Sequence, residues 1–150
     1  MTVNLITSLD DASFGRSKLG SIWGKIYFQI GSDQFFPENG WTDMVAAFAR
    51  AWLQGVLQIA NGRVGKDRVP FFDGPLAVDI SVQSHGFVHL EFIDNEAVKL
   101  ATTSELQDLL ENALAVASLV LQRCRERGWL NLDTEALTAL TADAPKRLSS

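Results

Sequence analysis

The segment from Trp41 to Ala60 constrains the fold of this chain more than any other. It reads WTDMVAAFARAWLQGVLQIA and predicts an α-helix, because its large apolar residues recur at helical spacing. Asn61 and Gly62 end this helix, since both residue types tolerate the left-handed backbone conformation. The apolar stripe is wider than the face of an ordinary amphipathic helix, and it consists of Met44, Val45, Phe48, Trp52, Leu53, Val56, Leu57 and Ile59. Other elements must therefore cover the helix on two sides.

The length and the cysteine content indicate one soluble domain without disulfide support. A chain of 150 residues is long enough to bury one core, so we expect a single domain over residues 1–150, with residues 142–150 as a frayed tail. Cys124 is the one cysteine, which excludes a disulfide framework and a metal site built from paired cysteines. The first residues have neither a basic start nor a long apolar run. We therefore expect a cytoplasmic protein with no membrane partner.

The negative charge of the chain is concentrated in its middle. The formal net charge is -5, which argues against a nucleic-acid partner, because proteins that bind nucleic acids normally present a basic face. Residues 67–111 contain nine acidic residues, and Arg68 and Lys99 are the two bases in the same segment. If this segment folds onto one face, that face attracts a basic partner.

Two strands are predicted before the long helix. Val3 to Ser8 alternates in polarity and suits a short strand, and Ser21 to Ile30 gives a longer one. In the second strand Ile22, Ile26, Phe28 and Ile30 share one face, and the opposite face holds Trp23, Lys25, Tyr27 and Gln29. Because the opposite face is only half polar, we expect Trp23 and Tyr27 to be covered by a loop or to form a binding surface.

A hairpin is predicted over Leu76 to Ile93. Its apolar residues alternate on both arms, and Ser84 to Gly86 forms a loop in which Gly86 adopts a positive φ. This loop sets a register that pairs Val82 with Val88 and Ile80 with Leu90 on the inner face. On the outer face it pairs Ser81 with His89 and Asp79 with Glu91. The last pair brings two carboxylates together, which destabilises a sheet unless a cation or basic group lies nearby, and Lys25 on a neighbouring strand could neutralise the pair.

The chain becomes helical again from Ser104. Ser104 and Gln107 fit a capping box, the apolar spacing continues for five turns, and Gly128 ends the helix. Trp129 is expected to pack back on the core. Asp133 is expected to cap a short helix that runs through Leu140.

These elements predict an α+β fold in the order ββαββα with a short C-terminal helix. We expect one antiparallel sheet of about four strands with the two long helices on one face, because no spacing requires a parallel crossover. The other face of the sheet would stay partly open. It is the candidate partner-binding surface, and its residues are Trp23, Lys25, Tyr27, Gln29, Asp79, Ser81, Gln83, Phe87, His89 and Glu91.

Two aromatic loops extend the candidate surface. One contains Phe35 and Phe36, and the other contains Phe71, Phe72 and Asp73. Burial statistics for phenylalanine favour rings that close the core over helix ends. Two alternatives stay open, namely that the rings anchor a protein partner or that they line a small-molecule pocket.

Two further places in the sequence hold side chains that could carry chemistry. Asp79, His89 and Glu91 could hold a metal or act as an acid–base set, although an ordinary solvated strand face is the more common explanation of such residues. Cys124 is a poor nucleophile, because an apolar helix position raises the pKa of its thiol. We therefore expect no catalytic residue, no metal and no cofactor.

Part of the chain resembles a known group. The runs YFQIGSDQFFPENGWTD, FDGPLAVDI and CRERGW resemble small uncharacterised bacterial proteins of the immunity type, which belong to polymorphic toxin systems. The matching runs cover about a quarter of the chain and hold structural motifs. The resemblance implies a small, acidic, soluble protein that binds its partner without catalysing a reaction.

The leading hypothesis is a bacterial immunity-type protein that neutralises a basic toxin or nuclease through its acidic hairpin face and aromatic loops. A metal-binding or small-molecule domain, possibly an enzyme that uses Asp79, His89 and Glu91, is the first alternative. The second alternative is a homo-oligomeric structural subunit joined through the sheet face.

Overall fold

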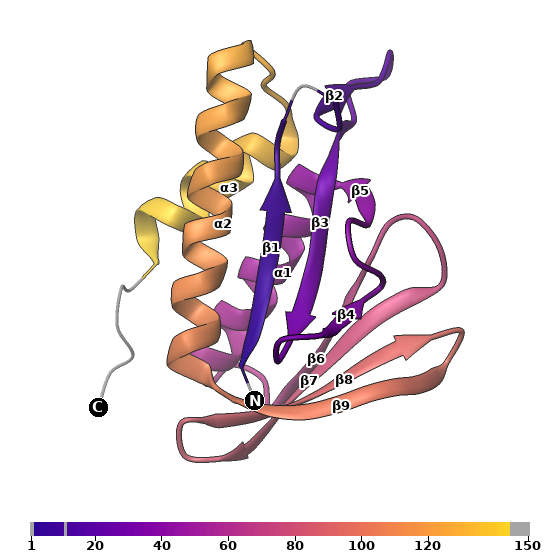
Figure 1. Cartoon of the computed structure of the whole chain (residues 1–150). Helices are drawn as coiled ribbons and strands as arrows, with labels where there is room; N and C mark the ends of the chain where they lie inside the picture. The colour runs from indigo at the N-terminus through magenta and orange to yellow at the C-terminus, as the bar shows by residue number, and fades with distance from the viewer. Residues whose placement is uncertain (1, 11, 145–150) are drawn as a thin grey trace.

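We describe the chain with a computed structural model that covers residues 2–10 and 12–144 (Figure 1). The fold is α+β, with antiparallel strands and three helices within these residues. The prediction of one sheet of about four strands is wrong, because the strands form two sheets. In chain order the elements are β1 (Val3–Ser8), β2 (Gly15–Arg16), β3 (Ile22–Ile30), β4 (Gln34–Phe36), β5 (Thr42–Met44), α1 (Val45–Ala60), β6 (Lys66–Pro70), β7 (Leu76–Ser84), β8 (Phe87–Asp94), β9 (Ala97–Glu105), α2 (Leu106–Arg127) and α3 (Leu132–Asp143).

β3 organises the first sheet, in which it pairs antiparallel with β1, β2, β4 and β5. The predicted alternation along β3 is confirmed, because every second residue from Ile22 to Ile30 is buried and those between are half-buried. Gly24 belongs to the buried series. A Cβ atom there would lie 2.9 Å from Leu9 Cδ2, so the strand packs closely against the segment that follows β1.

α1 is the central helix, and its predicted burial is confirmed. Its buried residues include Phe48, Trp52 and Leu53, and the helix contacts α2, α3, β3, β5 and β6. It begins at Val45, later than predicted, because Thr42 to Met44 pair with β3 as a short strand. Gly62 has a φ of 72° and ends the helix as expected, whereas Asn61 stays right-handed.

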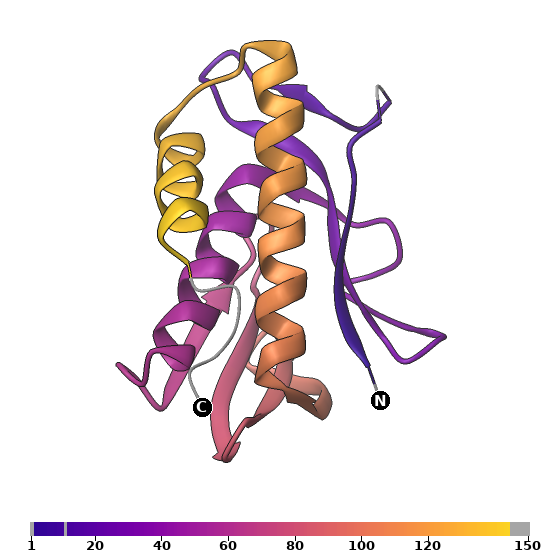
Figure 2. The same ribbon diagram turned by 90° about the vertical axis from the view of Figure 1, so that its left-hand side faces the viewer.

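The helices lie together on one side of the first sheet. Figure 2 shows α2 along its length, with α1 and α3 on one side of it and β1 and β3 on the other. The second sheet is the antiparallel series β6-β7-β8-β9, which packs below the first sheet in Figure 1. Both sheets and all three helices contribute to one cluster of buried residues.

Aromatic rings join the two sheets inside that cluster. Phe28 of β3 lies edge-on to Phe92 of β8, with 5.5 Å between the ring centroids, and to Trp52 of α1 at 4.9 Å. Phe71 stacks on Phe48 at 4.1 Å. Edge-to-face and offset arrangements of this kind are the favourable geometries for aromatic pairs. The second sheet is therefore attached to the first through side chains in the core.

The predicted hairpin register is confirmed. Ile80 lies opposite Leu90, Asp79 opposite Glu91 and Ser81 opposite His89. The loop is tighter than predicted, because Ser84 pairs with Phe87 across a bulge that follows Val82. Val82 lies opposite Val88 as predicted, but it is 52% exposed, so it is not part of the buried core.

Two strands of the second sheet lie in segments that the sequence did not assign to strands. β6 occupies part of the predicted loop between α1 and the hairpin, and β9 follows the hairpin directly. Among the described strands β6 pairs with β7 alone. It contains Pro70, which is compatible with an edge strand because proline has no backbone N–H to donate.

The ends of α2 and α3 need three corrections. Ser104 belongs to β9, so the predicted capping box with Gln107 does not form. Asn131, and not Asp133, caps α3 in a capping box with Thr134. Ala142 lies within α3 and not in a frayed tail; residues 145–150 of that predicted tail lie outside the described residues. Gly128 ends α2 as predicted, and Trp129 packs on Phe14 with 4.8 Å between centroids.

Candidate functional site

One member of the predicted carboxylate pair on the hairpin, Asp79, is neutralised by a base on a neighbouring strand. Arg68 of β6 donates two hydrogen bonds to Asp79, from Nε at 2.7 Å and from Nη2 at 3.0 Å. Its Nη1 also bonds Glu96 at 3.0 Å. Asp79 first and Glu96 second raise the pKa of Arg68 above its ordinary value. The base is therefore Arg68 and not the expected Lys25, which lies on β3 of the other sheet.

The same geometry weakens the metal hypothesis for Asp79, His89 and Glu91. Both carboxylate oxygens of Asp79 accept hydrogen bonds from Arg68, so the group is already engaged. Across residues 2–10 and 12–144 no group of three or more His, Cys, Asp or Glu side chains is arranged to hold a metal ion. His89 lies between Ser81 and Thr103 in the sheet register, which is an ordinary strand-face position.

The predicted aromatic residues do not form one surface. Trp23 and Tyr27 lie on β3 of the first sheet, whereas Asp79, His89 and Glu91 lie on the second sheet. The prediction of a single open face that carries all five residues is therefore wrong. Each Phe-Phe pair is divided between core and surface. Phe36 and Phe71 are buried, Phe35 is half-buried at 6.1 Å from Tyr27, and Phe72 is 46% exposed next to Asp73.

One buried carboxylate explains the geometry of the second aromatic loop. Asp43 of β5 is fully buried and accepts hydrogen bonds from the backbone N–H groups of Phe72 and Asp73, both at 3.2 Å. It also accepts bonds from the backbone N–H of Met44 at 2.7 Å and from the indole Nε1–H of Trp41 at 3.0 Å. Sequence reasoning did not single out Asp43, because its donors are brought to it from segments about 30 residues apart.

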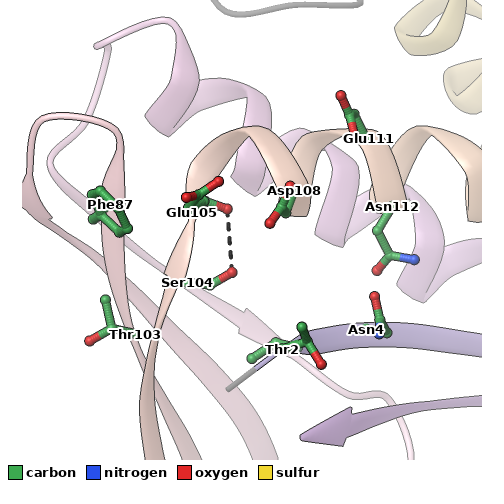
Figure 3. A pocket seen from close by; sticks show the side chains of 10 residues that line it. Thr2, Asn4, Phe87, Thr103, Ser104, Glu105, Asp108, Glu111 and Asn112 are labelled. Atoms are coloured by element: carbon green, nitrogen blue, oxygen red, sulfur yellow. Dashed lines mark hydrogen bonds between the residues drawn. The ribbon is translucent and has the colours of Figure 1, made fainter. Parts of the chain in front are cut away.

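A groove that sequence reasoning missed lies where β1, β9 and the start of α2 meet (Figure 3). Its volume is about 720 Å³. Figure 3 shows Thr2 and Asn4 on one side, Phe87 and Thr103 on the other, and three carboxylates along the upper rim. We call it the acidic groove, and it is lined by Thr2, Val3, Asn4, Phe87, Thr103, Ser104, Glu105, Asp108, Glu111 and Asn112.

Asn112 holds the two sides of the acidic groove together. Its side-chain oxygen accepts a hydrogen bond from the backbone N–H of Leu5 at 2.6 Å, and its amide nitrogen donates to the backbone oxygen of Leu5 at 3.1 Å. β1 pairs only with β3 among the described strands, so these bonds satisfy polar groups on its outer edge. The amide therefore fixes the edge of the first sheet against α2.

Within residues 2–10 and 12–144, none of the three carboxylates of the groove forms an ion pair. Glu105 precedes the first turn of α2, and Asp108 and Glu111 follow at a spacing that places them on one side of the helix. The ion pairs within the described ranges involve other acids, namely Asp79, Glu96, Glu126 and Asp133. Glu111 accepts a hydrogen bond from Gln107 Nε2 at 3.0 Å. The groove therefore carries negative charge that no base of the described residues neutralises.

The acidic groove is continuous with part of the predicted site. Phe87, His89 and Glu91 alternate along β8, so they share its outer face, and Phe87 lies directly opposite Glu105 of β9. Phe87 is 41% exposed and provides the apolar part of this surface. The acidic segment 67–111 was visible in the sequence, but the place where its last three acids gather depends on how β9 and α2 meet β1.

No protein-family model, curated protein or solved structure matches this chain. In the described part of the chain, no helix has the length and apolar character needed to cross a membrane.

Proposed function

We propose that this protein is a non-enzymatic binding protein whose acidic groove takes a basic surface of another protein. The observation that carries the proposal is the set of three carboxylates, Glu105, Asp108 and Glu111, which form no ion pair among the described residues and line the same groove as the exposed ring of Phe87. Charge complementarity speeds association, and a partly exposed aromatic ring supplies an apolar anchor.

The helix dipole accounts for part of this arrangement only. A carboxylate in the first turn of a helix is stabilised by the positive N-terminal end, and Asp108 is in that position. The effect fades within the first turn, so it gives little reason for Glu111, and it gives none for the position of Phe87. A basic partner accounts for all of these groups together.

An immunity-type role is the form of binding that we propose. The resemblance of three sequence runs to immunity-type proteins supports it, as does the acidic net charge of -5. The partner would then be a basic toxin or nuclease. A bacterial cytoplasmic location forms part of the same proposal, with the single cysteine as its supporting observation.

The test compares two double variants with the same change in charge. Asp108→Lys/Glu111→Lys reverses the groove, and Asp33→Lys/Glu38→Lys reverses two exposed acids on either side of β4. Each purified protein is immobilised and exposed to a lysate of its own source at low salt, and retained proteins are eluted with salt and identified by mass spectrometry. Circular dichroism checks that each variant is folded.

We expect the wild type and the β4 variant to retain a basic protein from the lysate. The groove variant should not retain it. With the purified partner, reversal of the groove should slow association about tenfold or more. If the groove variant retained the basic protein as well as the wild type does, the groove would not be the binding site. If only the β4 variant failed to retain it, the binding site would lie at the aromatic loops. Retention of no protein at low salt would count against the binding function itself.

A further inference from the structure

An apolar tip projects from the end of the molecule opposite the acidic groove. Leu19 is 97% exposed, Leu130 69% and Leu132 78%. Asn131 lies between the last two and donates a hydrogen bond from Nδ2 to the backbone oxygen of Gly20 at 3.1 Å, which holds the turn that carries Leu19 next to the α2–α3 connection. Figures 1 and 2 show the turn before β3 and the α2–α3 connection side by side at the top of both views.

The surroundings of this leucine tip are basic. Arg16 and Arg127 lie over the ring of Trp129, at 5.9 Å and 5.5 Å from its centroid, and Lys18 is exposed beside Leu19. Two of the nearby acids are paired with arginines, Glu126 with Arg123 at 2.9 Å and Asp133 with Arg50 at 3.1 Å, whereas the exposed Glu135 in the first turn of α3 forms none of the ion pairs among the described residues. The tip therefore combines apolar side chains with an excess of positive charge.

Groove and tip are complementary in three respects. The groove is concave, acidic and carries the exposed ring of Phe87, whereas the tip projects, is basic and carries three exposed leucines. They lie at opposite ends of α2, whose 22 residues span about 33 Å. A chain therefore cannot place its own tip in its own groove.

We propose that the leucine tip of one copy binds in the acidic groove of a second copy. This head-to-tail contact joins two different surfaces, so each dimer keeps one open groove and one open tip and can grow further. The inference rests on the proposed function, since it uses the same groove. A basic partner would compete with the tip, and its binding would release single copies.

The test uses one variant for each half of the contact. Leu19→Asp/Leu130→Asp removes the apolar and basic character of the tip at exposed positions, and Asp108→Lys/Glu111→Lys reverses the groove. Val64→Asp/Val98→Asp changes two exposed apolar residues elsewhere and serves as the control. Sedimentation velocity measures the mean mass of each protein from micromolar to millimolar concentration, at low and at high salt.

We expect the mean mass of the wild type and of the control to rise with concentration at low salt and to fall with added salt. Each variant alone should associate more weakly than the wild type, by a factor of about ten at least. A mixture of the two variants should still form dimers, because the tip of the groove variant fits the groove of the tip variant. The mixture should stop at dimers, since the remaining groove and tip are both inactive.

Three results would overturn the proposal. The first is a wild type that stays monomeric at low salt throughout the concentration range. The second is a mixture that fails to associate although the wild type does, which would indicate a symmetric contact. The third is a monomeric wild type that sediments with anionic lipid vesicles, which would make a lipid surface the occupant of the tip. If the protein does not self-associate but still binds a basic protein, the proposed function is supported and only the head-to-tail contact is excluded.

Discussion

At the scale of the single residue, Asp43 is the side chain on which the local geometry depends most. Its carboxylate is fully buried and accepts four hydrogen bonds, of which two, from Phe72 and Asp73, join β5 to the loop after β6. Buried donors that lose their acceptor cost about 1 to 3 kcal/mol each, less whatever relaxation recovers.

We predict that Asp43→Asn lowers the free energy of unfolding by about 2 to 4 kcal/mol, because the amide turns an N–H₂ group toward donors. Urea denaturation measures the change. Asp33→Asn is the matched control at an exposed position and should change stability by less than about 0.5 kcal/mol. Equal stability of the two variants would show that the hydrogen bonds of Asp43 contribute little.

Cys124 gives a second prediction at this scale. Burial raises the pKa of its thiol to about 11 from the ordinary value of 9.0, and the side chain is fully buried. The native protein should therefore resist thiol reagents near neutral pH and react only after unfolding. Rapid labelling under native conditions would contradict this.

The raised pKa of Cys124 also makes the stability of the fold depend on pH. Because the folded pKa is raised, the neutral thiol contributes its stabilisation below pH 9, and this contribution declines as the pH rises toward about 11. We expect the difference in unfolding free energy between the wild type and Cys124→Ala to shrink over this range. A difference that does not change with pH would show that the thiol titrates alike in both states.

At the scale of the element, the contact between α1 and β6 decides how one helix residue is tolerated. Replacing a helical glycine by alanine normally stabilises a helix by about 1 kcal/mol. At Gly55 a Cβ atom would lie 2.9 Å from Val69 Cγ2 and 3.1 Å from Asp67 Oδ2. Val69 is buried and branched at Cβ, so it has little freedom to move.

We predict that Gly55→Ala destabilises the protein by about 1 kcal/mol, since overpacking of about 1 to 3 kcal/mol outweighs the gain in helix propensity. A double-mutant cycle with Val69→Ala checks the cause. The cost of Gly55→Ala should fall or change sign when the valine methyl groups are absent. The same cost in both backgrounds would exclude Val69 as the source of the strain.

At the scale of the whole molecule, the two sheets depend on one aromatic core. Phe92 of β8 contacts Phe28 of β3 and Phe36 of β4, so removal of its ring affects both sheets. We predict that Phe92→Ala costs about 3 to 5 kcal/mol. We also predict that tryptophan fluorescence and far-ultraviolet circular dichroism report one coincident transition. Separate transitions would indicate that the sheets unfold independently, against the expected single domain.

The whole molecule also has an uneven distribution of charge. The start of α2 is acidic and its end is surrounded by arginines, so the chain has one attractive surface for bases and another for acids. Salt screens both surfaces. The two association experiments proposed above depend on this separation, which the net charge alone does not reveal.

Local patterns in the sequence were sufficient for several elements. The alternation of β3, the burial of α1, the end of α2 at Gly128 and the hairpin register all follow from periods of 2 or 3.6 residues and from the conformational freedom of glycine. These properties depend on neighbours in the chain. They can therefore be predicted without knowledge of the rest of the fold.

The tertiary structure alone decided what those elements contact. β6 and β9 are mostly exposed and become strands because the edges of β7 and β8 offer them backbone groups to pair with. Arg68 reaches Asp79 through that pairing, and Asp43 meets donors from distant segments. The acidic groove joins residues 2–4, 87 and 103–112. Long-range pairing depends on the packing of the whole chain, and no local period encodes it.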